Sequence, residues 1–165
     1  MIISFDVGIK NLAYCILTQD LEIVKWDVVD ISGTDFYDQS KILFEKLKNI
    51  HNDENNSIST CLIENQPCTK NPRMKSIQIM IYSYWTLSNI NTHMVSAINK
   101  LKVKNNTNKS EKLSYTQKKK KGIELALSYI ESTSQTSEIK EQFHKSKKKD
   151  DLADSFLQAI SWLNK

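Results

Sequence analysis

The first 31 residues contain three apolar runs rich in β-branched side chains, and only a few residues separate one run from the next. The runs cover 1–7, 11–17 and 21–31, with Gly8 at the first break. Strands joined by such short connections pair antiparallel, because a parallel neighbour needs a crossover of a dozen or more residues. The chain is therefore predicted to start as a three-stranded antiparallel sheet.

Helical and strand-like segments alternate after this start. Apolar residues recur at helical spacing in 36–50, 74–90, 122–131 and 151–165, and short apolar runs predict strands over 58–63 and 93–98. Polar segments are expected to be a lysine-rich loop before 122 and a linker over 132–137. The order predicts one α/β domain over 1–165, built on a mixed five-stranded sheet flanked by helices.

Several classes of protein are disfavoured. No run approaches the roughly 18 apolar residues of a membrane span, and the N-terminus lacks the pattern of a secretion signal. An intracellular protein without membrane contact is expected. Cys15, Cys61 and Cys68 have no CxxC spacing and are predicted to be reduced thiols, outside any disulfide or zinc site.

The net charge of +4 is unevenly distributed. Nine lysines and one acid, Glu111, lie between Asn99 and Lys121. A positive patch of this density attracts polyanions, of which nucleic acid is the commonest. A solvated loop in a lysine-rich protein is the alternative interpretation.

Three carboxylates stand in the motif "KKDDLADSF" near the C-terminus. Asp150 is explained by the affinity of a helix start for acids. Asp151 and Asp154 lie three residues apart and share one helix face, while the other face is apolar: Leu152, Phe156, Ala159, Ile160 and Leu163. A surface role and a cation site are equally compatible with this helix alone.

Two further acids occupy apolar strands. Asp6 lies inside the first run and Glu64 closes the run over 58–63. If these strands are neighbours and the C-terminal helix lays its acidic face over them, both acids meet Asp151 and Asp154 at one point. Like charges repel there unless divalent cations bind. An all-oxygen site favours Mg²⁺ or Mn²⁺, and two such ions about 4 Å apart are typical of nucleases.

The motifs "SFDVGIKNLAYCIL", "LIENQP" and "KKDDLADSF", in this order, resemble the RuvC-like Holliday-junction resolvases of the ribonuclease H-like superfamily. The sequence is most similar to the branch found in poxviruses and other large DNA viruses, with the fungal mitochondrial resolvases as relatives. The resemblance implies a ribonuclease H-like fold and a homodimeric endonuclease that makes paired symmetrical nicks in four-way DNA, without a small-molecule substrate. For a viral protein it also implies action in the host cytoplasm, where viral DNA is replicated.

The resemblance also implies roles for individual residues. Asp6, Glu64, Asp151 and Asp154 would bind two Mg²⁺ ions, for which Mn²⁺ can substitute. A catalytic lysine is implied in "YTQKKKKGIELAL", where the register leaves Lys119 and Lys120 as alternatives. Phosphate contacts are predicted for the surrounding basic residues: Lys70, Arg73, Lys75, Lys118 and Lys121.

Two other functions use the same residues. A related nuclease could cut an RNA–DNA hybrid or another branched DNA with the same acids. A non-catalytic protein that binds branched DNA would keep the fold. The apolar segment 74–90 also has two interpretations, a buried helix or a dimer interface.

Overall fold

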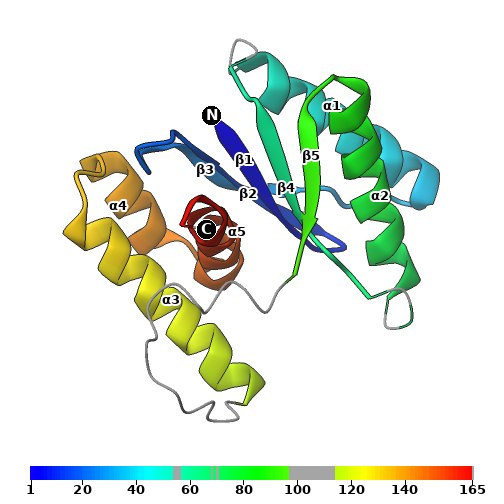
Figure 1. Cartoon of the computed structure of the whole chain (residues 1–165). Coiled ribbons are helices and arrows are strands. Elements are labelled where there is room, and N and C mark those ends of the chain that lie inside the picture. The colour runs from blue at the N-terminus through cyan, green and yellow to red at the C-terminus, as the bar shows by residue number, and fades with distance from the viewer. Residues whose placement is uncertain (54–56, 68, 70, 97–113, 165) are drawn as a thin grey trace.

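The structure is a computed structural model that describes residues 1–53, 57–67, 69, 71–96 and 114–164 (Figure 1). In chain order, its elements are β1 (Ile2–Val7), β2 (Asn11–Leu17), β3 (Ile23–Asp30), α1 (Phe36–Asp53), β4 (Thr60–Glu64), α2 (Pro72–Leu87), β5 (Asn91–Val95), α3 (Tyr115–Ser132), α4 (Ser137–Lys145) and α5 (Lys149–Leu163).

The strands form a single mixed sheet in the order β3-β2-β1-β4-β5. The pairs β1–β2 and β2–β3 are antiparallel, and β4 runs parallel to both β1 and β5. Gly8 lies between β1 and β2, where a Cβ atom would collide with the Asn11 carbonyl oxygen, so the turn requires glycine. The predicted α/β fold with a mixed five-stranded sheet is confirmed.

Helices cover both faces of the sheet (Figure 1). Helices α1 and α2 pack on one face, over odd-numbered residues of β1 such as Ile3 and Phe5. Helices α3, α4 and α5 belong to the core on the other face, where Ile2 also lies. Because side chains alternate along a strand, the even-numbered Asp6 projects toward the α5 side.

Two helical segments were not predicted as helices. Helix α3 starts at Tyr115, so Lys118 and its three lysine neighbours lie in a helix and not in a loop. Ser114 and Gln117 form a capping box at this start, and that signal was overlooked. The linker predicted over 132–137 matches the gap between α3 and α4 to within a residue, but α4 itself was not predicted. This helix buries only Ile139 and Phe143, which is too sparse for a clear apolar periodicity.

Other boundaries differ by a few residues. Helix α2 begins at Pro72, which suits a first helical position because the missing N–H is not needed there. It ends at Leu87, before the predicted boundary. The end of the strand predicted over 93–98 lies outside the described residues, as do Cys68, Lys70 and Glu111.

The thiols of Cys15 and Cys61 are free and buried, as predicted, and burial raises the pKa of both well above the usual value. Within the described ranges, none of the helices combines the length and the apolar character needed to cross a membrane.

Candidate active site

The ends of β1 and β4 bring two acids together. These strands are parallel neighbours, with Phe5 opposite Ile63, and the same register places Asp6 beside Glu64 at the next position. Both side chains are half-buried. Glu64 accepts a hydrogen bond from the Gln66 amide, with 3.1 Å between Nε2 and Oε2. The backbone of a central sheet therefore fixes both Cα positions.

Helix α5 lies over these strand ends and is anchored to the sheet by two buried side chains. Trp26 of β3 donates from Nε1 to the Leu152 carbonyl oxygen at 2.9 Å. Gln158 donates from Nε2 to Ser4 Oγ at 3.0 Å and to the Phe5 carbonyl oxygen at 3.1 Å. These contacts set how far α5 lies from the acid-bearing end of β1.

A cleft of about 600 Å³ lies where these elements meet. All four predicted acids line it: Asp6, Glu64, Asp151 and Asp154. The wall also includes the residues around Gly8, together with Gln66 and Met74. Three residues on the α3 and α5 side complete it: Tyr115, Lys119 and Lys148. The four acids from β1, β4 and α5 therefore line one cleft, as the sequence predicted.

The electrostatics of the cleft reflect this crowding. Burial, followed by the negative charges of Asp150 and Asp6, raises the pKa of Asp151 above its usual value. A cation would relieve this repulsion, and a set of carboxylate oxygens suits a hard divalent ion. In the part of the chain that the structure describes, no three His, Cys, Asp or Glu side chains are close enough to enclose a metal. The carboxylates are suitable ligands for such an ion, but their side chains would have to rotate to coordinate it together.

The structure separates the two candidate lysines. Lys119 lines the cleft, and its Nζ donates a hydrogen bond to Asp150 Oδ2. Lys120 points elsewhere: its side chain is 81% exposed, and its Nζ lies 3.9 Å from Glu124 Oε1. Asp150 lies in the first turn of α5, as expected, but Lys148 occupies the N-cap position.

Lys70 lies outside the described residues, and the other predicted basic residues do not line the cleft. Arg73 and Lys75 belong to the first turns of α2, whose Met74 does reach the cleft. The Arg73 guanidinium donates from Nε to Gln39 Oε1 at 2.9 Å, and Lys75 Nζ donates to Asn65 Oδ1 at 3.1 Å. On α3, Lys118 is exposed and Lys121 is half-buried.

Among the cleft residues missed from sequence are Tyr115 and Lys148, on the helical side of the cleft. Tyr115 stands one helical turn before Lys119, and Lys148 stands three residues before Asp151, with 3.8 Å between Nζ and Oδ2. Helical spacing from an already suspected residue was the available signal in both cases.

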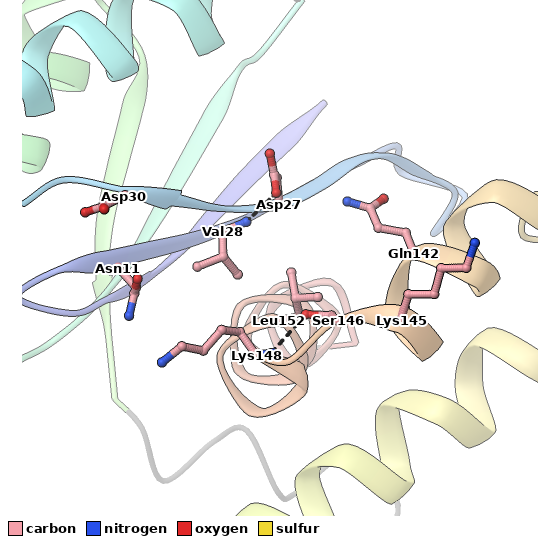
Figure 2. Close-up of a pocket in the computed structure, with 9 residues that line it drawn as sticks. All are labelled: Asn11, Asp27, Val28, Asp30, Gln142, Lys145, Ser146, Lys148 and Leu152. Atoms are coloured by element: carbon pink, nitrogen blue, oxygen red, sulfur yellow. Dashed lines mark hydrogen bonds between the residues drawn. The ribbon is translucent and has the colours of Figure 1, made fainter.

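A second cleft, of about 520 Å³, adjoins the first and shares Asn11 and Lys148 with it. Figure 2 shows it between the β2–β3 strands and the α4–α5 connection, with the Lys148 side chain extending toward Asn11. Lys145 comes from the end of α4 and Lys148 from the start of α5, while Asp27 and Asp30 come from β3. Charges of both signs therefore border this extension of the site.

The fold is shared with solved resolvase structures. The fowlpox virus resolvase, solved in complex with Holliday junction DNA, superposes with a TM-score of 0.72 at 21% identity, covering 99% of this chain and 96% of that one. The yeast mitochondrial Holliday junction resolvase Ydc2 gives 0.66 at 18% identity, with 98% and 78% covered. Thermus thermophilus RuvC in complex with a Holliday junction substrate gives 0.65 at 10% identity, with 97% and 90% covered. These likenesses confirm the predicted ribonuclease H-like architecture.

The sequence also matches one viral protein and one protein family. An uncharacterized protein of Acanthamoeba polyphaga mimivirus is 34% identical over 123 residues. The match covers 64% of this chain but only 29% of that longer relative. The family model described as "Poxvirus A22 protein" matches residues 1–165. This match spans the whole chain and confirms the resemblance inferred from the three acidic motifs. The chain therefore belongs to the poxvirus A22 protein family.

Proposed function

We propose that this protein is a Holliday junction resolvase, a structure-specific DNA endonuclease whose nuclease domain occupies residues 1–165. The observation that carries the proposal is the cleft in which four carboxylates from β1, β4 and α5 meet. Support comes from the family match and from the shared fold of resolvases, two of them solved with junction DNA.

Asp6, Glu64, Asp151 and Asp154 would hold two Mg²⁺ ions, and Mn²⁺ would substitute. Such ions, when bound, supply an activated water and neutralise charge on the leaving oxygen. Hydrolysis then leaves a 5′-phosphate and a 3′-hydroxyl, which a ligase can rejoin. The protein contributes position: Asp6 and Glu64 are fixed by a central sheet, and the acids of α5 are fixed by its anchors to β1 and β3.

Lys119 would place a positive charge beside the scissile phosphate. It is the lysine of the run 118–121 that lines the cleft together with all four acids. Charge placed in advance where the transition state is most negative is an effective way to lower a reaction barrier.

Basic residues around the cleft would hold the DNA backbone. The predicted contacts are Lys70, Arg73, Lys75, Lys118 and Lys121, and Lys148 now joins them because it borders both clefts. Phosphate contacts position DNA without reading its sequence, so recognition would rest on junction shape. The enzyme would act where viral DNA is replicated, which for a poxvirus-type virus is the host cytoplasm.

Paired symmetrical nicks require two active sites, so we propose a homodimer. Helix α2 was expected to be either buried or an interface, and its two faces differ in exposure. It buries Ile77, Ile81 and Trp85 against the sheet, but Ile79 is 43% exposed and Leu87 is 84% exposed. Replacing Leu87 by glutamate should shift the mass measured by light scattering toward the monomer, whereas glutamate at the exposed Thr86 should change it less. A monomeric wild-type protein at micromolar concentration would contradict the dimer.

The test of the proposed function compares substrates. The protein is incubated with a synthetic four-way DNA junction, a linear duplex and an RNA–DNA hybrid, in Mg²⁺, Mn²⁺ or EDTA. Paired nicks confined to the junction and absent in EDTA are expected. Cleavage of the hybrid alone would assign the protein to a ribonuclease function, and tight junction binding without cleavage under any metal would leave a non-catalytic binding protein.

A further inference from the structure

Lys119 is restrained more strongly than Lys120, the other candidate lysine. Its Nζ donates a hydrogen bond to Asp150 Oδ2 and lies 5.3 Å from the centroid of the Tyr115 ring. The Lys119 side chain is 37% exposed, compared with 81% for Lys120. The hydrogen bond to Asp150 is also the main cause that raises the pKa of Lys119 above its usual value, so its charge is secure at neutral pH.

The partner of this lysine comes from a different helix. Lys119 belongs to α3, whereas Asp150 belongs to the first turn of α5, directly before Asp151. The pair therefore connects the helix that carries the lysine to the helix that carries two of the acids. Asp150 is not the N-cap of α5, and it is not among the residues that line the cleft. Capping alone does not account for its contact with Lys119.

The cleft creates a need for such a restraint. A lysine side chain is long and flexible, and fixing it costs conformational entropy. The four carboxylates of the cleft would attract a loose ammonium group, which would then occupy the position where a metal ion must bind. Asp150 offers Lys119 a carboxylate outside that set of four.

We propose that Asp150 is a positioning residue, which holds Lys119 at the margin of the carboxylate cleft, ready to meet the scissile phosphate. This inference rests on the proposed nuclease function. It assigns to Asp150 a role in the reaction that acts through Lys119 and not through contact with the DNA or the metal.

The test is a double-mutant cycle read by single-turnover cleavage of a four-way junction at saturating protein. The variants are Asp150→Asn, Lys119→Met and the double variant, and junction affinity is measured for each. Asp150→Asn should lower the cleavage rate about tenfold, because a catalytic group that is slightly misplaced loses much of its effect. In the Lys119→Met background the same change should cost less than about twofold, since coupled residues are not additive.

Two further variants separate positioning from a merely structural role. Glu138→Gln removes an acid from the first turn of α4, so it reports the cost of losing an acid near a helix start. It should leave the cleavage rate unchanged. Asp150→Glu keeps a carboxylate within reach of Lys119 and should restore most of the rate. Junction affinity should stay within about twofold in every variant, because the proposed effect is on the reacting geometry.

An equal fold-loss from Asp150→Asn in both backgrounds would overturn the proposal, as would no loss at all. Cleavage by the wild-type protein tests the proposed function independently of either result. If the wild type cleaves nothing, competitive acetylation followed by mass spectrometry still decides the question. Asp150→Asn should then increase the labelling of Lys119 relative to Lys120, and an unchanged ratio would refute the positioning role.

Discussion

Gly122 offers a sharp test of how α3 packs against α5, the helix that carries Asp151 and Asp154. It is buried in the middle of α3, and a Cβ atom built there would lie 3.8 Å from Asp154 Oδ1 and 4.0 Å from Leu157 Cδ1. Both are ordinary van der Waals distances, so a methyl group fits without displacing either neighbour. The change Gly122→Ala should therefore stabilise the protein.

The magnitude follows from helix propensity. Alanine is favoured over glycine inside a helix by about 1 kcal/mol, because glycine loses more backbone entropy on folding. We expect the free energy of unfolding to rise by about 0.5–1 kcal/mol, which corresponds to a Tm higher by about 1–4 °C for a chain of this size. Junction cleavage should stay within about twofold of wild type, since Asp154 does not have to move.

Urea denaturation of Gly122→Ala and of two comparison variants measures the change in the free energy of unfolding. Ser128→Ala, at an exposed position of the same helix, gives the propensity effect without any new contact. Gly122→Leu adds a side chain that would overlap Asp154 and Leu157, so it should lose about 1–3 kcal/mol and most of the cleavage. If Gly122→Ala is destabilised by about 1 kcal/mol or more with an unchanged m-value, then α3 and α5 lie closer than described and the reasoning fails.

Three other results are expected. Lys119→Met should lower single-turnover cleavage by at least about tenfold, whereas Lys120→Met should leave it within about twofold; the reverse order would assign the role to Lys120. Asp151→Asn should raise the Tm of the metal-free protein at pH 7, measured in EDTA, because the raised pKa means that ionised Asp151 opposes folding. That effect should be absent at pH values below 3.8, the usual pKa, where the aspartic acid is protonated in both states, and an effect independent of pH would contradict it. Trp26→Phe should lower the free energy of unfolding, measured by urea denaturation, by about 2 kcal/mol, because the hydrogen bond to Leu152 is lost and a cavity remains. An unchanged free energy of unfolding would show that this anchor of α5 is dispensable.

Much of the fold was accessible from sequence because its determinants are local. The three opening strands are separated by short breaks, and the acids of β1 and β4 interrupt apolar runs where burial makes a carboxylate costly. Asp151 and Asp154 were identified by helical spacing. Their convergence with Asp6 and Glu64 required that β1 and β4 be neighbours and that α5 lie over the strand ends, and the structure shows both.

What sequence could not provide depends on contacts between distant segments. Four consecutive lysines are equivalent in pattern, and only the packing of α3 against α5 distinguishes Lys119 from Lys120. For the same reason Asp150 was interpreted as a helix-start acid, since its partner lies 31 residues earlier. Helix α4 was missed because its buried surface is supplied by two side chains, Ile139 and Phe143, in an otherwise polar segment.

The measurement that tests the central claim most directly is junction binding and cleavage by wild-type protein and Asp6→Asn in parallel, with Mg²⁺ and with EDTA. The wild type should cleave only with Mg²⁺. Asp6→Asn should bind the junction with similar affinity and lose at least about a thousandfold in rate, since one carboxylate of a shared metal site is removed. Cleavage by Asp6→Asn at the wild-type rate, or wild-type cleavage that persists in EDTA, would contradict a metal-dependent site at the four carboxylates.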